Sequence, residues 1–343
     1  MDRWYEKEGR NSDVVLASRV RLARNVENYN FSFMLDDADA NIMINDIVDK
    51  LQDEEAFKKM KHYNFNGLNA YQKLAMKERH CISSFLENQD YAAGFVSPDE
   101  EMSIMINEED HVRIQSFKAG MNIKEAYAEA DRMDDCIGEK LSYSYDEKFG
   151  YLTTCPSNAG TGMRASYLLF LPVLGGNDKI SGLVSEVGRF GLTLRAMEGD
   201  NKKALGDIYQ LSNQVTLGKS EKEIMINLDN IAEQIISQER SLREQYFSQR
   251  KCQAEDLIYR SYGVLKYARR LSLKDGMLLL SQIKLGISMG IISPVKKDEE
   301  NIYPLMIGIH PANLILLNEK EFNSDELDIA RAEYVRQNLP EIR

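Results

Sequence analysis

Alternation of apolar and polar positions predicts that the first two thirds of the chain is rich in β-strands. In an extended segment, residues two apart share a face, so Val20 and Leu22 are expected on one side of a strand and Arg19 and Arg21 on the other. The turn SPDEE between two such runs predicts a β-hairpin. Strands are predicted over the ranges 13–25, 91–96, 102–106, 111–117, 180–187 and 192–197.

Apolar positions three and four residues apart predict helices, which follow one another from residue 220 onward. Ser220 and Glu223 have the spacing of a capping box at a helix start. The apolar run MRASYLLFL after Gly162 predicts a buried helix. Further helices are predicted over the ranges 38–51, 121–141, 254–271, 273–290 and 325–339. The pattern therefore predicts an α+β fold, in which a mixed domain is followed by a helical C-terminal domain, with the boundary near 218–245.

Length and composition favour a cytoplasmic protein of two domains, or of one large domain with an appendage. The 343 residues are 43% hydrophobic, no apolar run approaches the ~18 residues of a membrane span, and the polar N-terminus lacks a signal peptide's apolar region. The four cysteines have no metal-ligand spacing, so we expect reduced thiols, no membrane association and no protein-held metal. They are Cys81, Cys136, Cys155 and Cys252.

Charge indicates the kind of ligand. The net charge of −11 argues against direct nucleic-acid binding, yet several arginines cluster in short motifs. Positive charge concentrated within an acidic chain suits a small, dense anion such as a nucleotide triphosphate. The pair Arg19 and Arg21 is compatible with a solvated basic strand, or with a face that grips a phosphate chain through bidentate bonds.

The stretch 150–171, GYLTTCPSNAGTGMRASYLLFL, has the composition of an anion-binding turn. Gly160 and Gly162 would let the backbone approach a ligand, and the expected helix start would point NH groups at it, with Arg164 in its first turn. An ordinary connection between strand and helix is the alternative, and the Walker A pattern is absent. Cys155, beside this helix start and the arginines, is predicted to be a thiolate, whereas burial would leave it a neutral packing residue.

Carboxylates follow the hairpin. Glu108, Glu109 and Asp110 lie between two predicted strands, with Arg113 close behind. Such a cluster is either a solvated turn or a site that binds a guanidinium group or a metal. The sequence RAMEGD at 195–200 predicts either a mobile lid or a plain polar loop.

Taken together, SRVRLARN, NEEDHVRIQ, CPSNAGTGMRAS and RAMEGD resemble the catalytic domain of the phosphagen kinase (ATP:guanidino phosphotransferase) family over residues 12–242. Each motif is weakly specific, but their combination and order are highly specific. The resemblance implies an antiparallel sheet flanked by helices. A helical domain over 243–343 that follows this catalytic domain, and the sequence DIYQLSNQVTLG at 207–218, resemble the bacterial protein arginine kinases within this family.

The resemblance implies roles for individual residues. Glu109 matches the carboxylate that binds the substrate guanidinium and acts as base, Cys155 the active-site cysteine, and Asp200 a second substrate-binding acid that is glutamate in the family. Asp328 and Arg331 match a phosphoarginine-binding motif in which Leu327 replaces the first arginine. The implied ATP-binding residues are Ala17, Ser18, Arg19, Val20, Arg21, His80, Arg113, Arg164, Ala165, Ser166, Tyr167, Leu168, Arg195, Ala196, Met197, Glu198 and Gly199.

The same resemblance implies an activity and partners. The expected reaction transfers the γ-phosphate of ATP, with Mg²⁺, to arginine side chains of proteins, including a heat-shock repressor, and marks them for degradation by the Clp ATPase and protease. A small zinc-binding activator protein and a homodimer formed through the C-terminal domain are also expected. Two alternatives stay open: a kinase of a free guanidino metabolite such as arginine, and a non-catalytic adaptor that binds nucleotide or phosphoarginine.

Overall fold

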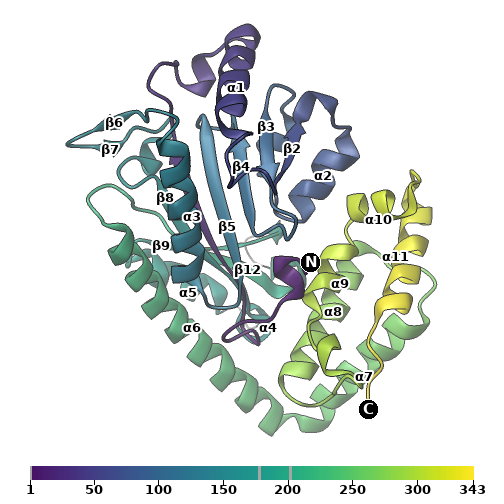
Figure 1. Cartoon of the computed structure of the whole chain (residues 1–343). Coiled ribbons are helices and arrows are strands. Elements are labelled where there is room, and N and C mark those ends of the chain that lie inside the picture. Colours follow the sequence, from purple (N-terminus) through teal and green to yellow (C-terminus); the bar gives the residue numbers. More distant parts are fainter. Residues whose placement is uncertain (1, 177–178, 201–202) are drawn as a thin grey trace.

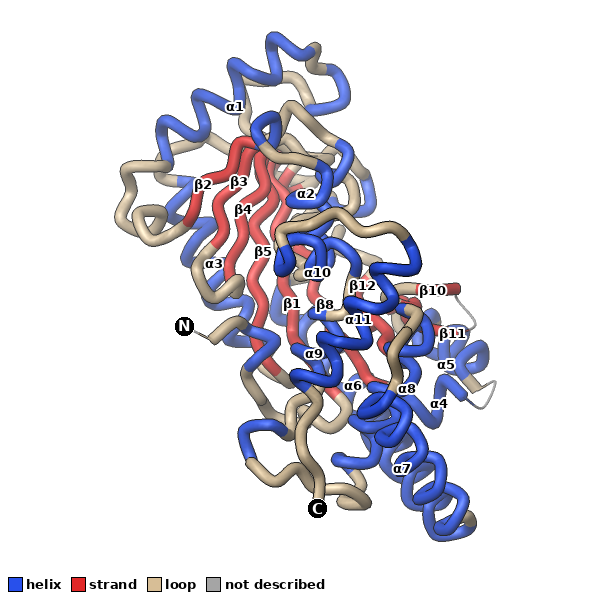
Figure 2. The backbone as a smooth tube through the Cα atoms, turned by 90° about the vertical axis from the view of Figure 1, so that its right-hand side faces the viewer, coloured by secondary structure: helices blue, strands red, loops and turns tan. Residues whose placement is uncertain are grey.

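A single twisted antiparallel sheet forms the centre of the molecule (Figure 2). The computed structural model describes residues 2–176, 179–200 and 203–343. Within them the sheet has eight strands, in the spatial order β2 (Lys61–Asn64), β3 (Ala93–Val96), β4 (Met102–Ile106), β5 (Val112–Ala119), β1 (Val15–Arg24), β8 (Met163–Phe170), β12 (Ile208–Asn213) and β9 (Leu192–Ala196). Two small hairpins project from it, β6 (Tyr145–Asp146) with β7 (Gly150–Tyr151), and β10 (Gly199–Asp200) with β11 (Lys203–Ala204).

Helices cover both faces of the sheet (Figures 1 and 2). One face packs on α1 (Asp37–Leu51), α3 (Ile123–Gly138), α5 (Ile180–Gly188) and α6 (Glu221–Gln249). The other face is covered near one end by α2 (Ala70–Glu78) and near the other by the C-terminal helices. A short helix, α4 (Pro172–Gly176), follows β8. The C-terminal helices are α7 (Lys251–Tyr267), α8 (Leu273–Ser288), α9 (Tyr303–Gly308), α10 (Pro311–Asn318) and α11 (Ser324–Asn338).

The core explains why the strands alternate. Val20, Ile114 and Ala165 are fully buried against α1, α3 and α6, and their neighbours along each strand face the opposite side. On that opposite side Trp4 stacks on Phe117 at 4.4 Å between ring centroids, inside a second core formed with the C-terminal helices. The predicted α+β architecture, with an antiparallel sheet and a helical C-terminal region, is confirmed.

Helix α6 runs from the sheet into the C-terminal region (Figure 1). Its start carries the predicted capping box, with Ser220 and Glu223 bonded reciprocally. The helix ends at Gln249, and Arg250, with φ of −137° and ψ of 38°, separates it from α7. The expected boundary between residues 242 and 243 therefore falls inside one continuous helix.

Two predicted elements are wrong. The run 163–171 was predicted to be a helix and is the strand β8, because both of its faces are covered and an unbroken apolar run has no period that distinguishes a buried strand from a buried helix. The range 180–187 was predicted to be a strand and forms α5, whose buried residues Ile180, Leu183 and Val187 have helical spacing. The other predicted strands and helices are present with small shifts at their ends.

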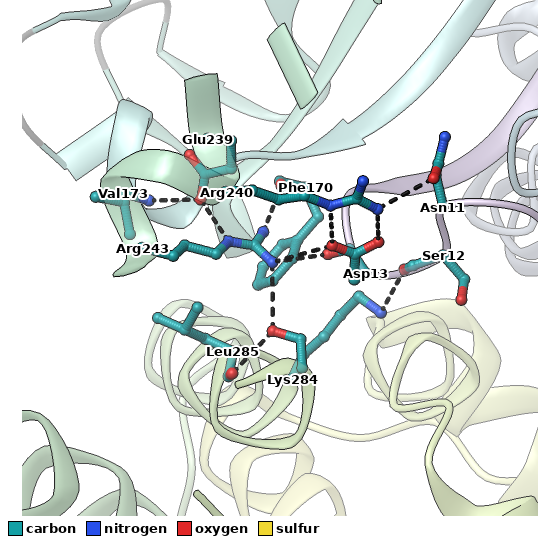
Figure 3. A network of polar contacts seen from close by, with 11 residues as sticks. Asn11, Ser12, Asp13, Phe170, Val173, Glu239, Arg240, Arg243, Lys284 and Leu285 are labelled. Carbon is teal, nitrogen blue, oxygen red and sulfur yellow. Dashed lines mark hydrogen bonds and ion pairs between the residues drawn. The ribbon is translucent and has the colours of Figure 1, made fainter. Parts of the chain in front are cut away.

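A buried ionic network joins α6, the segment before β1 and α8 (Figure 3). Arg243, 2% exposed, donates to Glu239 at 2.7 Å, and to the carbonyls of Asp13 and Phe170, both at 3.1 Å. Lys284 on α8 donates to the Ser12 carbonyl at 3.3 Å. Burial, and then the positive charge of Arg243, lowers the pKa of Lys284 to about 8.

Replacing Lys284 by methionine is expected to stabilise the protein at pH 7. Because the pKa of Lys284 is lower in the folded state than in the unfolded state, the charged amine opposes folding below pH 8, and this cost disappears as the pH rises toward about 10.5. Lys284→Met should therefore raise the free energy of unfolding by about 1–3 kcal/mol at pH 7 and by less at pH 10. Denaturant titrations at both pH values measure this, with the exposed Lys251→Met as control. A loss of stability at pH 7 would contradict the argument.

Candidate active site

Five arginines from four strands of the sheet face the same side of it. Arg19 and Arg21 belong to β1, Arg113 to β5, Arg164 to β8 and Arg195 to β9. In the antiparallel register Arg21 lies directly opposite Arg164, and Arg113 lies opposite Ala23. Like charges directly opposite one another destabilise a sheet unless something neutralises them. The strand pairing therefore builds a concentrated cationic surface.

These arginines line a cavity of about 560 Å³. Its wall contains site residues that the sequence predicted. They come from five separate segments of the chain, which the fold brings together. The predicted residues that line it are Arg19, Arg21, Glu109, Arg113, Cys155, Arg164, Arg195, Ala196 and Met197.

The positive charge in the cavity is only partly compensated. Burial, followed by repulsion from Arg113 and Arg164, lowers the pKa of Arg19 to about 10. Burial and the neighbouring arginines also lower the pKa of Arg21 far below its usual value, and that of Arg164 to a lesser degree. The Nε groups of Arg21 and Arg164 are buried without a hydrogen-bond partner among the described residues. Unpaired donors and depressed arginine pKa values together indicate a site for a polyanion, and a triphosphate fits this chemistry.

The two glutamates of the β4–β5 turn have different environments. Glu108 is 1% exposed, and its carboxylate accepts bonds from Arg113 at 2.5 Å and from the Ser83 hydroxyl at 2.7 Å. The Glu109 side chain is 46% exposed and accepts a bond from Arg113 at 3.2 Å. Glu108 therefore holds Arg113 in place, and Glu109 is the carboxylate that an incoming cation can reach.

Cys155 lies across the cavity on the segment between β7 and β8. Its Sγ is 3.0 Å from the Ser157 hydroxyl. The predicted helix after Gly162 is absent, and the nearest helical element is the three-residue 3₁₀ turn Pro156–Asn158. The prediction that a helix N-terminus lies beside Cys155 is therefore wrong. The positive charge near Cys155 comes from the arginine surface, including Arg164.

The two glycines of this segment serve the fold. A Cβ on Gly162, which has φ of +63°, would lie 2.5 Å from a guanidinium nitrogen of Arg24 and 2.6 Å from the Ala23 carbonyl oxygen. A Cβ on Gly160, with φ of +102°, would lie 2.9 Å from backbone atoms of Thr216 and Leu217. Their freedom is needed for close approach of other protein segments, and Gly162 also lines the cavity, where the sequence predicted approach of a ligand.

Several residues in the predicted ATP-binding stretches do not line the cavity. Val20, Ala165 and Tyr167 point into the core, because they alternate with the arginines. The hydroxyl of Ser18 donates to the Gly120 carbonyl at 2.7 Å, and Ser166 accepts from Arg19 at 3.4 Å. Ala17 and Leu168, from the same predicted stretches, belong to the second core and also do not line the cavity.

His80 lies at the junction with the C-terminal helices. Its Nε2 is 3.3 Å from the Tyr303 hydroxyl, and its ring lies against Trp4 at 5.9 Å between centroids. Burial, and then Arg19, lowers the pKa of His80 to about 3, so the ring is neutral. It lines a second, much smaller cavity of about 20 Å³ together with Glu198. In this structure the arginine cavity and His80 are therefore adjacent features, not one pocket.

The loop after β9 contains the remaining predicted residues. Glu198 Oε2 lies 3.9 Å from the His310 ring. Gly199 and Asp200 form β10, but the Asp200 side chain lies outside the described residues. Its expected role as a substrate ligand stays a prediction.

Arg331, which belongs to the expected phosphoarginine motif, is buried and bonded to other parts of the C-terminal region. It is 2% exposed, and it donates to the carbonyls of Ile309 at 2.9 Å and Leu271 at 2.8 Å, and to Asp328 at 2.7 Å. These bonds tie α11 to the neighbouring C-terminal segments.

Replacing Arg331 by alanine is therefore expected to destabilise the protein by about 3 kcal/mol, because two carbonyls and a carboxylate lose their donor in a buried setting. Chemical denaturation measures the change. Arg270→Ala, at a 59% exposed side chain paired with Asp325, is the control and should cost less than about 0.5 kcal/mol. Equal effects of the two substitutions would contradict the structural role of Arg331.

Sequence reasoning missed part of the cavity wall. Ser83, Ser84 and Phe85 have no strand or helix pattern that would have placed them beside the sheet. Gln210 and Ser212 could have been found, since they are polar residues two apart in a strand next to β9. The missed residues that line the cavity are Ala23, Ser83, Ser84, Phe85, Ser157, Asn158, Gln210 and Ser212, whereas Glu108 and Gly162, which also line it, belong to motifs that the sequence singled out.

The described part of the chain offers no cluster of three or more His, Cys, Asp or Glu side chains that would hold a metal ion. None of its helices combines the length and the apolar character needed to cross a membrane.

Comparisons with known proteins agree with this geometry. Residues 42–242 match the family model described as ATP:guanido phosphotransferase, C-terminal catalytic domain, and residues 251–343 match the protein-arginine kinase McsB C-terminal domain. The protein-arginine kinase of Clostridium acetobutylicum is 39% identical over 99% of this chain and 100% of its own length. That of Bacillus subtilis is 38% identical over 98% of this chain and 93% of its own length.

Solved structures share the fold of the sheet domain. Lombricine kinase superposes with a TM-score of 0.60 at 24% identity, covering 69% of each chain. The duplicated taurocyamine kinase from Schistosoma mansoni superposes with a TM-score of 0.59 at 23% identity, covering 67% of this chain and 33% of that one.

Proposed function

The chain belongs to the ATP:guanido phosphotransferase family and to its protein arginine kinases, and from this premise we propose that it transfers the γ-phosphoryl group of ATP to arginine side chains of proteins. The observation that carries the proposal is the cavity in which five arginines face one reachable carboxylate, Glu109. A cationic wall suits the phosphates of ATP, and a carboxylate suits the guanidinium group that receives the phosphate.

The arginine surface would hold the triphosphate and stabilise the transition state. Phosphoryl transfer has little covalent chemistry for the protein to perform, so rate enhancement comes from positioning and from preorganised positive charge. Arg21 and Arg164 have buried donors ready for phosphate oxygens, and Arg113 is fixed in place by Glu108. Mg²⁺ bound to the phosphates would neutralise further charge on the transferred group.

Glu109 would orient and deprotonate the acceptor. A guanidinium group has a pKa above ~12 and its nitrogens are poor nucleophiles. A carboxylate that accepts two N–H bonds aligns one nitrogen toward the phosphorus and takes its proton as the N–P bond forms. Glu109 is exposed to the cavity beside the arginines, which is the position this role requires. Cys155 lies in the same wall, where its sulfur would contact the guanidinium and favour its reactive form.

The C-terminal region favours a protein as the acceptor. Similarity to the protein-arginine kinases extends over nearly the whole chain, including the helices after residue 250, and is not confined to the catalytic domain. The proposed partners are protein substrates with exposed arginines, such as a heat-shock repressor, together with a small zinc-binding activator, the Clp protease machinery and a second copy of the chain.

The test is incubation of the purified protein with ATP, Mg²⁺ and an arginine-rich protein, with free arginine as a parallel acceptor. Mass spectrometry at neutral pH preserves the acid-labile N–P bond. Phosphoarginine on the protein alone supports the proposal, and chelation of Mg²⁺ should abolish it. Phosphorylation of free arginine would show a metabolite kinase instead. Absence of transfer to either acceptor, also after addition of the candidate activator, would show a non-catalytic adaptor.

A further inference from the structure

A buried carboxylate, Asp110, lies between the two segments that carry the candidate catalytic residues Glu109 and Cys155. It follows Glu109 in the β4–β5 turn and is 0% exposed. It is not among the residues that line the arginine cavity. Its charge is therefore removed from the place where ATP and a guanidinium group would bind, and its contacts within the protein must explain its presence there.

One oxygen of Asp110 joins two loops that are distant in sequence. Oδ1 accepts a bond from the backbone N–H of Thr154 at 2.7 Å and another from the side-chain amide of Asn25 at 2.7 Å. Thr154 immediately precedes Cys155, as Glu109 immediately precedes Asp110. A single atom therefore couples the backbone that carries Glu109 to the backbone that carries Cys155.

Asn25 completes the connection. Its Oδ1 accepts from the backbone N–H of His111 at 2.9 Å, and its amide nitrogen also donates to the Leu152 carbonyl at 3.0 Å. Asn25 is 1% exposed and follows the last residue of β1, the strand that carries Arg19 and Arg21. The amide thus bonds both loops to the end of the arginine strand, and these bonds determine which side of the amide is oxygen.

The second oxygen of Asp110 makes it possible to test whether this residue acts through its hydrogen-bond geometry or through its negative charge. Oδ2 is buried and has no hydrogen-bond partner among the described residues. The observed bonds therefore use only the acceptor capacity of Oδ1, which an asparagine at this position would retain. A role that depends on the negative charge would be lost in asparagine.

We propose that Asp110 is a positioning residue that sets the placement of Glu109 relative to Cys155 through its Oδ1 bonds to Thr154 and Asn25, an inference whose catalytic consequence rests on the proposed function. Two groups that act on one guanidinium must be placed within a fraction of an ångström, and a 1 Å error can reduce the rate by about 10²-fold. A buried, doubly bonded carboxylate oxygen is suited to provide that precision.

The test compares Asp110→Ala with Asp110→Asn. Asp110→Ala should lower kcat for the protein substrate by about 10²-fold, with KM for ATP changed by less than about threefold, because the described bonds of Asp110 go to Thr154 and Asn25 and not to the arginines of the cavity. Asp110→Asn should retain kcat within about threefold of the parent. Glu239→Gln, at another buried carboxylate in the network of Figure 3, is the control and should lower the melting temperature without changing kcat.

A second measurement does not depend on activity. The rate at which iodoacetamide alkylates Cys155, followed on its own peptide by mass spectrometry, should change at least threefold in Asp110→Ala and remain close to the parent in Asp110→Asn. Cys252, which is exposed, serves as the internal reference. This result is informative even if the parent protein phosphorylates nothing, so failure of the proposed function and failure of the positioning role can be told apart.

Two outcomes would overturn the proposal. One is normal kcat and normal Cys155 alkylation in Asp110→Ala. The other is equal loss in Asp110→Asn and Asp110→Ala, which would show that charge matters and geometry does not. If Asp110→Ala does not melt cooperatively, Asn25→Ala replaces it. That variant leaves the bond to Thr154 in place, so the expected reduction in kcat is smaller, about tenfold, and unchanged kcat would again contradict the proposal.

Discussion

Replacing Glu109 by glutamine is expected to reduce kcat by about 10³-fold, since glutamine has nearly the same shape but cannot take a proton or pair with a guanidinium charge. ATP binding should persist, because Arg113 keeps its 2.5 Å bond to Glu108. Turnover on a protein substrate and equilibrium binding of ATP together measure the effect.

Two further variants separate the possible causes of this loss. Glu109→Asp retains the charge but shortens the side chain by one methylene, so partial activity would show that reach matters in addition to basicity. Glu125→Gln, at an exposed position on α3, is the matched control and should leave kcat unchanged. Normal turnover in Glu109→Gln would remove this residue from its assigned role as base.

Replacing Arg21 by methionine is expected to change activity and stability in opposite directions. Methionine fills a similar volume without charge, so kcat/KM for ATP should fall by about 10³-fold with the loss of a guanidinium that faces the phosphates. The unliganded protein should become more stable by about 1 kcal/mol, because a buried cation directly opposite Arg164 is removed. Sites that are preorganised for a charged ligand commonly oppose stability in this way.

Thermal melting with and without ATP and Mg²⁺ tests both parts of this prediction. The parent protein should melt at a higher temperature with nucleotide, and the increase should be smaller in Arg21→Met. Arg132→Met, at a side chain that is 75% exposed on α3, should leave the melting temperature and the nucleotide effect unchanged. A destabilised, fully active Arg21→Met would show that Arg21 supports the sheet and does not bind phosphate.

The cationic surface could be predicted from local sequence because a strand has a period of two. Val20 and Leu22 had to face the core, so Arg19 and Arg21 had to share the other face, and the structure confirms this. The same reasoning failed after Gly162. Apart from Arg164, the residues from 163 to 171 are buried on both faces, so their local pattern contains no period, and the neighbouring strands β1 and β12 decide that they form a strand.

The anion site illustrates how a correct conclusion can rest on a wrong element. The predicted helix N-terminus does not exist, yet Arg164 reaches the cavity because β8 places it opposite Arg21. The helical prediction attributed the positive potential to backbone NH groups, whereas the structure attributes it to guanidinium groups. The practical difference is that the positive potential depends on side chains, so substitution of single arginines should weaken anion binding, whereas backbone NH groups could not be removed in this way.

The sequence by itself determined the residue types of the site, the order of the motifs, the alternating faces of most strands and the helical C-terminal region. These features depend on contacts within a few residues along the chain, where local periodicity and capping carry the information. Only the tertiary structure decided that Glu108 binds Arg113 while the Glu109 carboxylate stays accessible. It also decided that Arg331 donates to backbone carbonyls. The bond from the Thr154 backbone N–H to Asp110, which links two distant loops, is a third feature of this kind. Each of these depends on which groups remain unpaired after the chain has packed, and pairing between residues tens of positions apart leaves no pattern in the local sequence.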